Sequence, residues 1–486
     1  MQPRTVDRPL RAAIVGAGPS GFYAGEQLLE AGLEVHLFDA LPTPFGLVRS
    51  GVAPDHPKIK SVTRVYERTA VREGFQFFGG VELGNHVSRH DLLDRYDVVV
   101  YAIGMSDDRR LSIPGEDAAG SHAATQFVAW YNAHPDFANH PVDLSCDAAV
   151  VIGNGNVALD VARMLVLSPA ELATTDTADH AVEAFASSAI RRVVVLGRRG
   201  PAQAAFTTPE LRELGALSRA DVIVDPADLV LDAASETWLA SDAADATARR
   251  NVEILREYSQ RKPDGHSHQV ELRFLRSPLE VLVDERGRTR GLVVTRNELQ
   301  TDSSGQVRAV ATDEQEEIEC GLVFRSIGYR GRPTAGLPFD EQRGLIRNEG
   351  GRVLDDHGRV APGEYVVGWI KRGPVGVIGT NKKDAADTVS RIVQDIQAGL
   401  INQPNASSDP DAIAEWLRAR VDRVIRWDGW VRIDEHERSV GEPQGRPRVK
   451  LVSVPDMIAV ADDTYIADPR GCRPGQPDSC SFIPAR

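Results

Sequence analysis

This 486-residue sequence has few cysteines, no long apolar run and no excess of positive charge. No two of the four cysteines form a C-x-x-C pair, which excludes a dithiol redox centre and an iron–sulfur cluster bound by this chain alone. We expect no metal site. No apolar run approaches the roughly 18 residues of a membrane helix, and a first strand beginning by Ala12 leaves no room for a cleavable targeting segment. We therefore expect a cytoplasmic protein.

Basic side chains are in the minority, with 56 Lys and Arg against 70 Asp and Glu and a formal charge of −14. The chain thus lacks the overall basic character of a nucleic-acid-binding protein, and we expect neither nucleic acid nor a membrane as a partner. A hydrophobic fraction of 42% and a charged fraction of 26% are typical of globular proteins. At about 150 residues per domain, the length accommodates two or three domains.

A buried strand followed by a glycine-rich turn and a helical pattern occurs twice, at residues 12–15 and 148–152. This order predicts an α/β fold with two Rossmann-like dinucleotide-binding domains. Two further apolar runs, at 96–104 and 322–331, are interpreted as crossovers between the domains. The second domain is then inserted into a discontinuous first domain. We predict a first domain of residues 1–107 and 332–457, an inserted domain of residues 108–331, and a tail at 458–486 of unassigned role.

The first glycine turn has the three glycine spacings of a dinucleotide-binding fingerprint. Its residues are Gly16, Gly18, Pro19, Ser20 and Gly21. The next predicted strand ends in Asp39, 18 positions beyond Gly21, where a carboxylate can accept hydrogen bonds from a ribose diol. The alternative is an ordinary glycine turn followed by an exposed aspartate at a strand end.

The second glycine turn repeats the pattern but leads to a different strand end. Its residues are Gly153, Asn154, Gly155, Asn156 and Val157, with Ala158 in the third glycine position. The strand at 192–196 then leads into Arg198 and Arg199, and paired guanidiniums suit a 2′-phosphate. This site is predicted to prefer NADP(H) over NAD(H), unless the arginines form only a solvated turn. One acid-ended site and one arginine-ended site suggest a flavin held in the first and a nicotinamide visiting the second.

Four motifs in order resemble the adrenodoxin-reductase-like ferredoxin–NADP reductases, which belong to the glutathione-reductase-type superfamily with two dinucleotide-binding domains. They are LPTPFGLVRSGVAPDHP from Leu41, GNGNVALD from Gly153, LGRRGPAQAAFTTPEL from Leu196 and GWIKRGPVGVIGTNKKD from Gly368. The resemblance implies FAD in the discontinuous domain, NADP(H) in the inserted domain, and hydride transfer from NADPH to the flavin N5. It also implies single-electron transfer to a ferredoxin-type iron–sulfur protein that feeds a cytochrome P450 or a similar oxidase.

The glycine turns, the two strand ends and the resemblance together assign the cofactor-binding residues. Those for FAD are Gly16, Gly18, Pro19, Ser20, Gly21, Asp39, Ala40, Gly46, Leu47, Val48, Ala102, Gly104, Trp369, Gly376, Val377 and Ile378. Those for NADP are Gly153, Asn154, Gly155, Asn156, Val157, Arg198, Arg199, Glu210 and Gly376. Trp369 and Gly376 are implied to lie against the isoalloxazine, with Val377 donating through its backbone; the alternative for Trp369 is a core position. A helix is predicted after this segment, with Thr380 or Asn381 as its cap and Gly399 at its end.

Three residues are candidates for the chemistry: His56, Asp160 and Glu210. The resemblance implies that His56 pairs with Asp160 close to the flavin, and that Glu210 lies near the nicotinamide. Hydride transfer strictly needs no general base, so His56 would tune the flavin or orient the rings, or serve only as a structural hydrogen-bonding residue. Glu210 has an alternative as an acid in the first turn of a helix.

An acidic electron carrier requires a locally basic surface on this acidic chain. The candidate is a predicted helix around residues 249–262, in which Arg249, Arg250 and Arg256 would contact the partner. A solvated helix face is the alternative. Rival functions are a flavin monooxygenase and an NADPH-binding sensor that passes no electrons. We expect a monomer or a weak dimer.

Overall fold

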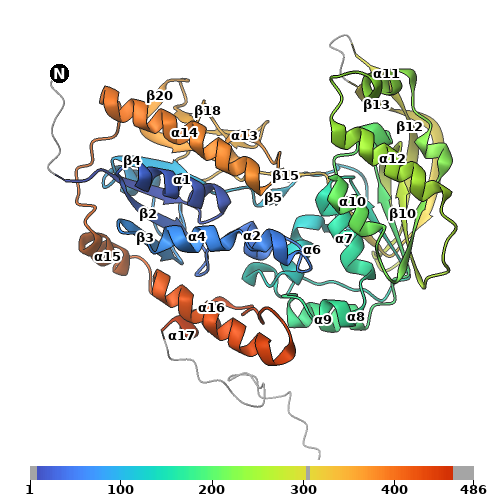
Figure 1. Cartoon of the computed structure of the whole chain (residues 1–486), viewed down its shortest axis with the longest axis horizontal. Coiled ribbons are helices and arrows are strands. Elements are labelled where there is room, and N and C mark those ends of the chain that lie inside the picture. Colours follow the sequence, from blue (N-terminus) through green and yellow to red (C-terminus); the bar gives the residue numbers. More distant parts are fainter. Residues whose placement is uncertain (1–7, 303–306, 463–486) are drawn as a thin grey trace, which may run out of the picture.

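Two mostly parallel β-sheets organise the chain, as seen in a computed structural model that describes residues 8–302 and 307–462. Figure 1 shows the sheet of the discontinuous domain, in blue and orange, beside the inserted domain, in green and yellow. The α/β class with Rossmann-like sheets is therefore confirmed. The predicted tail, with Cys472 and Cys480, lies almost entirely outside the described residues, and helix α17 already ends at Ala461.

The sheet of the discontinuous domain has seven strands in the order β18-β19-β20-β4-β1-β2-β3. Its central strands are apolar and buried, as expected for a parallel sheet covered on both faces. The strands are β1 (Arg11–Val15), β2 (Glu34–Asp39), β3 (Phe75–Gly79), β4 (Val98–Tyr101), β18 (Asn348–Glu349), β19 (Arg352–Leu354) and β20 (Val360–Val366). The helices are α1 (Pro19–Glu30), α2 (Leu47–Ser50), α3 (Pro57–Lys60), α4 (Thr63–Ala70), α5 (Arg89–Leu93), α13 (Trp369–Arg372), α14 (Ile378–Ala398), α15 (Pro410–Arg418), α16 (Trp427–Gly441) and α17 (Val454–Ala461).

The inserted domain carries a six-stranded sheet in the order β6-β14-β7-β8-β10-β9. Its strands are β6 (Ser121–Ala123), β7 (Ala148–Ile152), β8 (Arg192–Leu196), β9 (Ala220–Val224), β10 (His268–Arg273) and β14 (Leu322–Arg325). Its helices are α6 (Ala124–Tyr131), α7 (Asn156–Val166), α8 (Pro169–Leu172), α9 (Asp179–Ala186), α10 (Thr208–Leu214), α11 (Ala233–Ala240) and α12 (Ala246–Gln260). A separate antiparallel sheet is formed by β11 (Arg276–Val283), β12 (Thr289–Thr301) and β13 (Val307–Glu319).

Strand order places a binding crevice at the carboxyl end of one strand in each sheet. Strand β1 pairs in parallel with β2 on one side and β4 on the other, and β7 does so with β8 and β14. In open parallel sheets, ligands bind at the switch point, where the connections from two neighbouring strands lead in opposite directions along the sheet. The two glycine turns follow β1 and β7, so each occupies such a switch point.

A two-stranded ribbon of β5 (Asp107–Asp108) and β15 (Tyr329–Arg330) connects the domains. The predicted boundaries at 107/108 and 331/332 fall within or beside this ribbon, and they stay a prediction. No helix in residues 8–302 and 307–462 is both long and apolar enough to cross a bilayer.

The helix predicted after Gly376 forms as α14, and Gly399 ends it in the left-handed conformation at φ 68°. Its predicted cap is wrong, because the first helical residue is Ile378 and the cap position is Val377. Thr380 lies inside the first turn, where its hydroxyl accepts the N–H of Val377 (3.2 Å). Asn381 accepts instead from the guanidinium of Arg372 (2.7 Å).

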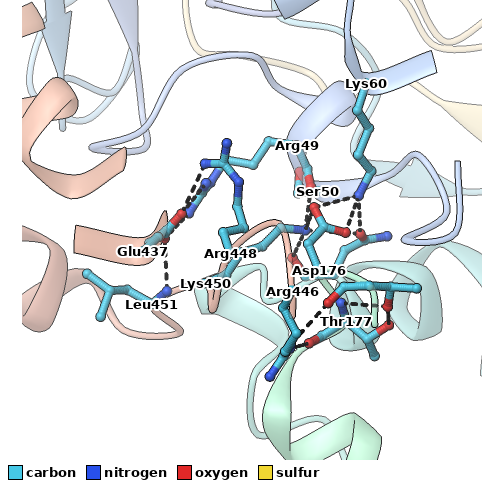
Figure 2. A network of polar contacts seen from close by, with 12 residues as sticks. Arg49, Ser50, Lys60, Asp176, Thr177, Glu437, Arg446, Arg448, Lys450 and Leu451 are labelled. Carbon is cyan, nitrogen blue, oxygen red and sulfur yellow. Dashed lines mark hydrogen bonds and ion pairs between the residues drawn. The ribbon is translucent and has the colours of Figure 1, made fainter. Parts of the chain in front are cut away.

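A buried polar network joins the discontinuous domain, the inserted domain and the segment after α16 (Figure 2). At its centre, which we name the junction cluster, are Lys60, Asp176 and Lys450. The Asp176 carboxylate accepts from Lys60 Nζ (2.6 and 2.9 Å) and pairs with Lys450 Nζ (3.1 Å). The Lys450 and Asp176 side chains are only 1% and 7% exposed. One buried carboxylate therefore serves two ammonium groups from distant parts of the chain.

Candidate functional site

The first glycine turn is tight because its backbone approaches neighbouring backbone closely. A Cβ on Gly16, whose φ is 109°, would lie 2.3 Å from the Ala102 carbonyl oxygen, and one on Gly21 would lie 2.0 Å from the Gly16 carbonyl oxygen. At Gly18, in contrast, no atom lies within 4 Å of the Cβ position. Gly18 is the cap of α1, and no side chain caps the first N–H groups of that helix. The turn thus presents free donors and open space, which suits a pyrophosphate.

Asp39 lies at the end of β2 and holds the first turn in place. Its Oδ2 accepts the N–H of Ala17 (2.7 Å) and its Oδ1 accepts the N–H of Leu41 (2.9 Å). Burial raises the pKa of this carboxyl to about 6, although both backbone bonds lower it. Each oxygen retains a second lone pair, so the predicted bonds to a ribose diol are compatible with these contacts.

Two further segments reach the first turn from distant parts of the sequence. Gly46, at φ 49°, lies so close that its Cβ would be 3.0 Å from the Gly18 Cα. A Cβ on Gly368 would lie 2.3 Å from the Ser20 Oγ, and the Gly368 N–H donates to Asp384 Oδ2 (2.6 Å). The structure therefore brings the predicted FAD residues around 16–21, 46–48 and 102–104 together with the segment that begins at Gly368.

Trp369 offers a hydrogen-bond donor that no residue in the described part of the chain satisfies. Its indole Nε1 is buried without a partner among the described residues, and its ring centroid lies 5.0 Å from that of Tyr329. An unpaired buried donor is costly unless a ligand satisfies it. The N–H of Val377 donates to Thr380, so donation to a flavin requires that 3.2 Å bond to be exchanged. The orphan indole and the open glycine turn fit FAD.

The second glycine turn repeats the geometry of the first. A Cβ on Gly153, whose φ is 133°, would lie 2.0 Å from the Ser326 carbonyl oxygen, whereas no atom lies within 4 Å of the position at Gly155. Gly155 caps α7, again without a side-chain cap. Asn156 has a role that its sequence motif did not indicate, since its Oδ1 accepts the N–H of Thr207 (2.7 Å) and holds the start of α10.

Two arginines without an acidic partner among the described residues follow strand β8. Arg198 is exposed, Arg199 is half-buried, and neither forms a salt bridge in the part of the chain that the structure describes. Burial, with the neighbouring charge of Arg198, lowers the pKa of the Arg199 guanidinium. Two adjacent cations without a counter-charge are suited to a phosphate group.

His56 lies in a cluster that differs from the predicted pair. Its Nε2 lies 2.6 Å from Glu213 Oε2 and 2.8 Å from an Arg163 nitrogen. The predicted pairing with Asp160 is wrong, because Asp160 bonds instead to the same Arg163 nitrogen (2.8 Å). The guanidinium therefore separates the imidazole from that aspartate.

Arg163 is the centre of this cluster, and it was not identified from the sequence. Its side chain is 3% exposed, and it pairs with Asp55 (2.7 Å), Asp160 (2.8 Å) and Glu210 (3.4 Å). Glu213 was also missed. The spacing that could have revealed both is helical, since Arg163 follows Asp160 by three positions and Glu213 follows Glu210 by three.

This cluster contains more carboxylates than cations, and the pKa values of the carboxylates differ from one another. Burial, together with the charge of Asp160, raises the pKa of Glu210 to about 7. Burial also raises the pKa of Asp160, although the Arg163 charge opposes it. Burial acts in the same direction on Asp55, but the hydrogen bonds from Arg163 prevail and lower its pKa. Glu210 is therefore a carboxyl that can exchange a proton near neutral pH.

The arginines predicted for partner docking lie on α12, which forms as predicted. Arg249 donates to the Leu239 (2.7 Å) and Ser241 carbonyls and so holds the end of α11. Arg250 pairs with Glu253 (2.7 Å), whereas Arg256 is exposed and has no salt bridge among the described residues. Docking through this helix stays a prediction.

Comparison with known proteins agrees with this geometry. A profile of the pyridine nucleotide-disulphide oxidoreductases matches residues 10–195. The NADPH-ferredoxin reductase FprA of Mycobacterium tuberculosis is 50% identical over 464 residues, covering 93% of this chain and 99% of the relative. The mitochondrial NADPH:adrenodoxin oxidoreductase of Arabidopsis thaliana is 41% identical over 467 residues, covering 93% and 96%. A solved structure of M. tuberculosis FprA with NADPH matches with a TM-score of 0.87 and 49% identity, covering 93% of this chain and all of that one. The chain belongs to the adrenodoxin-reductase-like ferredoxin–NADP reductases within the pyridine nucleotide-disulphide oxidoreductase family.

Proposed function

We propose that this chain is an NADPH:ferredoxin oxidoreductase that takes electrons from NADPH through FAD and passes them to a ferredoxin-type iron–sulfur protein. The observation that carries the proposal is the difference between its two glycine-turn sites. One ends in the half-buried carboxylate of Asp39, while the other ends in Arg198 and Arg199, which form no salt bridge with any described residue. The names of the relatives, which refer to NADPH with ferredoxin or adrenodoxin, support the same activity.

FAD, when bound, accepts a hydride from NADPH and releases electrons singly. The residues of this chain bind the two cofactors and orient them toward each other. The uncapped N–H groups of α1 and α7 receive the two pyrophosphates, since both helices begin beside open glycine positions. Arg198 and Arg199 receive the 2′-phosphate, and the indole N–H of Trp369 donates to the flavin.

The cluster around Arg163 lies where the two domains meet, and we propose that it manages protons and charge beside the reacting rings. His56 Nε2 either donates to Glu213 or accepts from Arg163, so it holds a proton only when it pairs with Glu213. Glu210, with its pKa of about 7, holds or releases a proton in the same cluster. We propose that His56 and Glu213 hold the proton on His56 Nε2 together as a pair, and that Asp160 positions Arg163.

The partner is a ferredoxin-type protein, which we propose docks through basic residues that include Arg256 and feeds a cytochrome P450 or a similar oxidase. Cytoplasmic location and a monomeric or weakly dimeric state complete the proposal. A flavin monooxygenase and a sensor that passes no electrons are the rivals. Hydroxylation coupled to NADPH oxidation would favour the first, and a bound flavin that NADPH does not reduce would favour the second.

The test is a visible spectrum of the purified protein before and after anaerobic titration with NADPH. We expect FAD absorbance that bleaches with NADPH at lower concentrations than with NADH. Reduced protein is then mixed with oxidised ferredoxin and cytochrome c, and cytochrome c reduction that requires ferredoxin is expected. A protein without flavin, or a flavin that NADPH leaves oxidised, contradicts the proposal.

A further inference from the structure

The loop that carries the two arginines is held on its backbone side by the three-stranded sheet. All three consecutive carbonyls of residues 197–199 accept hydrogen bonds from residues at or near β11 and β12. The Gly197 oxygen accepts from the N–H of Arg276 (3.0 Å), and the Arg199 oxygen accepts from the N–H of Leu275 (3.2 Å). The Arg198 oxygen accepts from the side-chain amide of Asn297 (2.7 Å). The middle carbonyl is the one held by a side chain.

Asn297 is buried, and both its side chain and its backbone are hydrogen-bonded in this region. It is 2% exposed, and its Nδ2 donates to both the Arg198 oxygen (2.7 Å) and Ser277 Oγ (2.8 Å). Because a carbonyl oxygen only accepts, the amide must present its nitrogen to Arg198. Its backbone N–H donates to Leu275 (2.8 Å).

The register of the sheet explains why Asn297 faces the loop. The pairing of β12 with β13 shifts between Thr295 and Asn297, which is the irregularity of a β-bulge. A bulge changes the direction of the side chains that follow it. Arg296 is exposed at the bulge, and Asn297 turns inward to the loop. Leu275, at φ 56°, adopts the left-handed conformation that non-glycine residues rarely take, and its N–H thereby reaches Arg199.

We propose that Asn297 is a positioning residue for NADPH selectivity: it holds the Arg198 carbonyl inward so that the guanidiniums of Arg198 and Arg199 face the 2′-phosphate of the cofactor. The inference rests on the proposed function, in which these arginines receive that phosphate. In the structure, the loop backbone bonds toward the sheet, while the Arg198 side chain is exposed and forms no salt bridge within residues 8–302 and 307–462. The three-stranded sheet, which lies outside the six-stranded dinucleotide-binding sheet, thus contributes to cofactor choice.

The test measures binding of two nucleotide fragments to the purified holoenzyme by calorimetry. Adenosine 2′,5′-bisphosphate carries the 2′-phosphate, and 5′-AMP lacks it. In Asn297→Ala we expect the bisphosphate to bind about tenfold more weakly, which corresponds to about 1.4 kcal/mol and lies near the upper end for one neutral hydrogen bond, while the affinity for 5′-AMP changes less than about twofold. The KM for NADPH should rise with an unchanged kcat. Glu298→Gln, on the exposed side of the same strand, is the control and should change neither affinity.

Several outcomes separate this role from a merely structural one. An equal loss of affinity for both fragments, or no loss for either, overturns the proposal. In an Arg198→Ala background, Asn297→Ala should cause no further selective loss, because the two residues act together. If Asn297→Ala does not fold, Ser277→Ala removes the other partner of the amide and should give a smaller loss confined to the bisphosphate. If the wild-type protein itself does not distinguish the fragments, the phosphate assignment fails, and with it the proposed function.

Discussion

Replacing Asp176 tests whether the junction cluster joins the two domains. Asp176 is the only carboxylate that neutralises Lys450 among the described residues, and both are buried. Asp176→Asn keeps the shape but leaves the ammonium groups of Lys60 and Lys450 without a counter-charge. Removal of one partner from a buried ion pair costs about 3–5 kcal/mol. We expect a loss near 3 kcal/mol, since Lys60 is 15% exposed and can turn to solvent.

The pH dependence of the variant supplies a second, independent measurement. Burial already lowers the pKa of Lys450 well below its usual value, and Asp176 opposes that shift. Without Asp176 the pKa of Lys450 falls further. The folded variant therefore binds fewer protons than the unfolded chain at every pH between the pKa of Lys450 in the folded variant and its pKa in the unfolded chain. Stability then rises with pH up to about 10.4, the usual lysine value. The wild-type protein follows the same slope once its own Lys450 is deprotonated, so the stability deficit of the variant should shrink or stay constant, and should not grow, between pH 7 and pH 9.5.

The assay is urea unfolding of the holoenzyme at both pH values, with Asp179→Asn as a matched control. Asp179 forms an ion pair with Arg446, but the Asp179 side chain is 57% exposed. Exposed ion pairs contribute only about 0–1 kcal/mol to the free energy of unfolding. The double variant Asp176→Asn with Lys450→Met should recover part of the loss, because no unpaired buried ammonium remains. An Asp176→Asn protein no less stable than Asp179→Asn, or with a deficit that grows with pH, would refute the reasoning.

Three other predictions concern the nucleotide sites. Gly155→Ala should fold with an unchanged melting temperature, because the Cβ position is open. The added methyl group should raise the KM for NADPH at least about tenfold, because it occupies the space of the pyrophosphate. An unchanged KM contradicts the assignment. Gly153→Ala should instead lower the melting temperature, because its Cβ would lie 2.0 Å from the Ser326 oxygen. Glu210 has a folded pKa raised to about 7, so the folded protein keeps that proton longer than the unfolded chain, and stability should fall as pH rises from about 4.5 to 7. Glu210→Gln should flatten this slope in melting curves, and an unaltered slope would exclude Glu210 as its source.

Local sequence patterns predicted the parts of the molecule that depend on neighbouring residues. The glycine turns form where three glycines follow a buried strand, because Gly16 and Gly153 take the positive φ that glycine adopts without steric cost. The end of α14 at Gly399 has the same local cause. These features need no knowledge of the tertiary fold.

The partners of His56 depend on how two helices of the inserted domain approach the loop of another domain, which no local pattern contains. Arg163 is on α7 and Glu213 is on α10, and both reach His56 only after the domains pack. The junction cluster has the same origin, since Asp176 and Lys450 are 274 positions apart. In both places the sequence showed charged residues without showing which charges meet.

The inserted domain presents opposite charges at the two ends of its predicted nucleotide site. Just after β8, Arg198 and Arg199 are cations without an acidic partner in the part of the chain that the structure describes. Around Arg163, four carboxylates surround one guanidinium and one imidazole, and the resulting repulsion contributes to the raised pKa of Glu210. NADP⁺ has the complementary distribution, with phosphates at its adenosine end and a positive charge on its oxidised ring. Because a charge gradient of this kind acts before close contacts form, it favours entry of NADP⁺ with the phosphate toward the arginines and the ring toward His56. For NADPH, whose reduced ring is uncharged, only the attraction between the phosphate and the arginines acts.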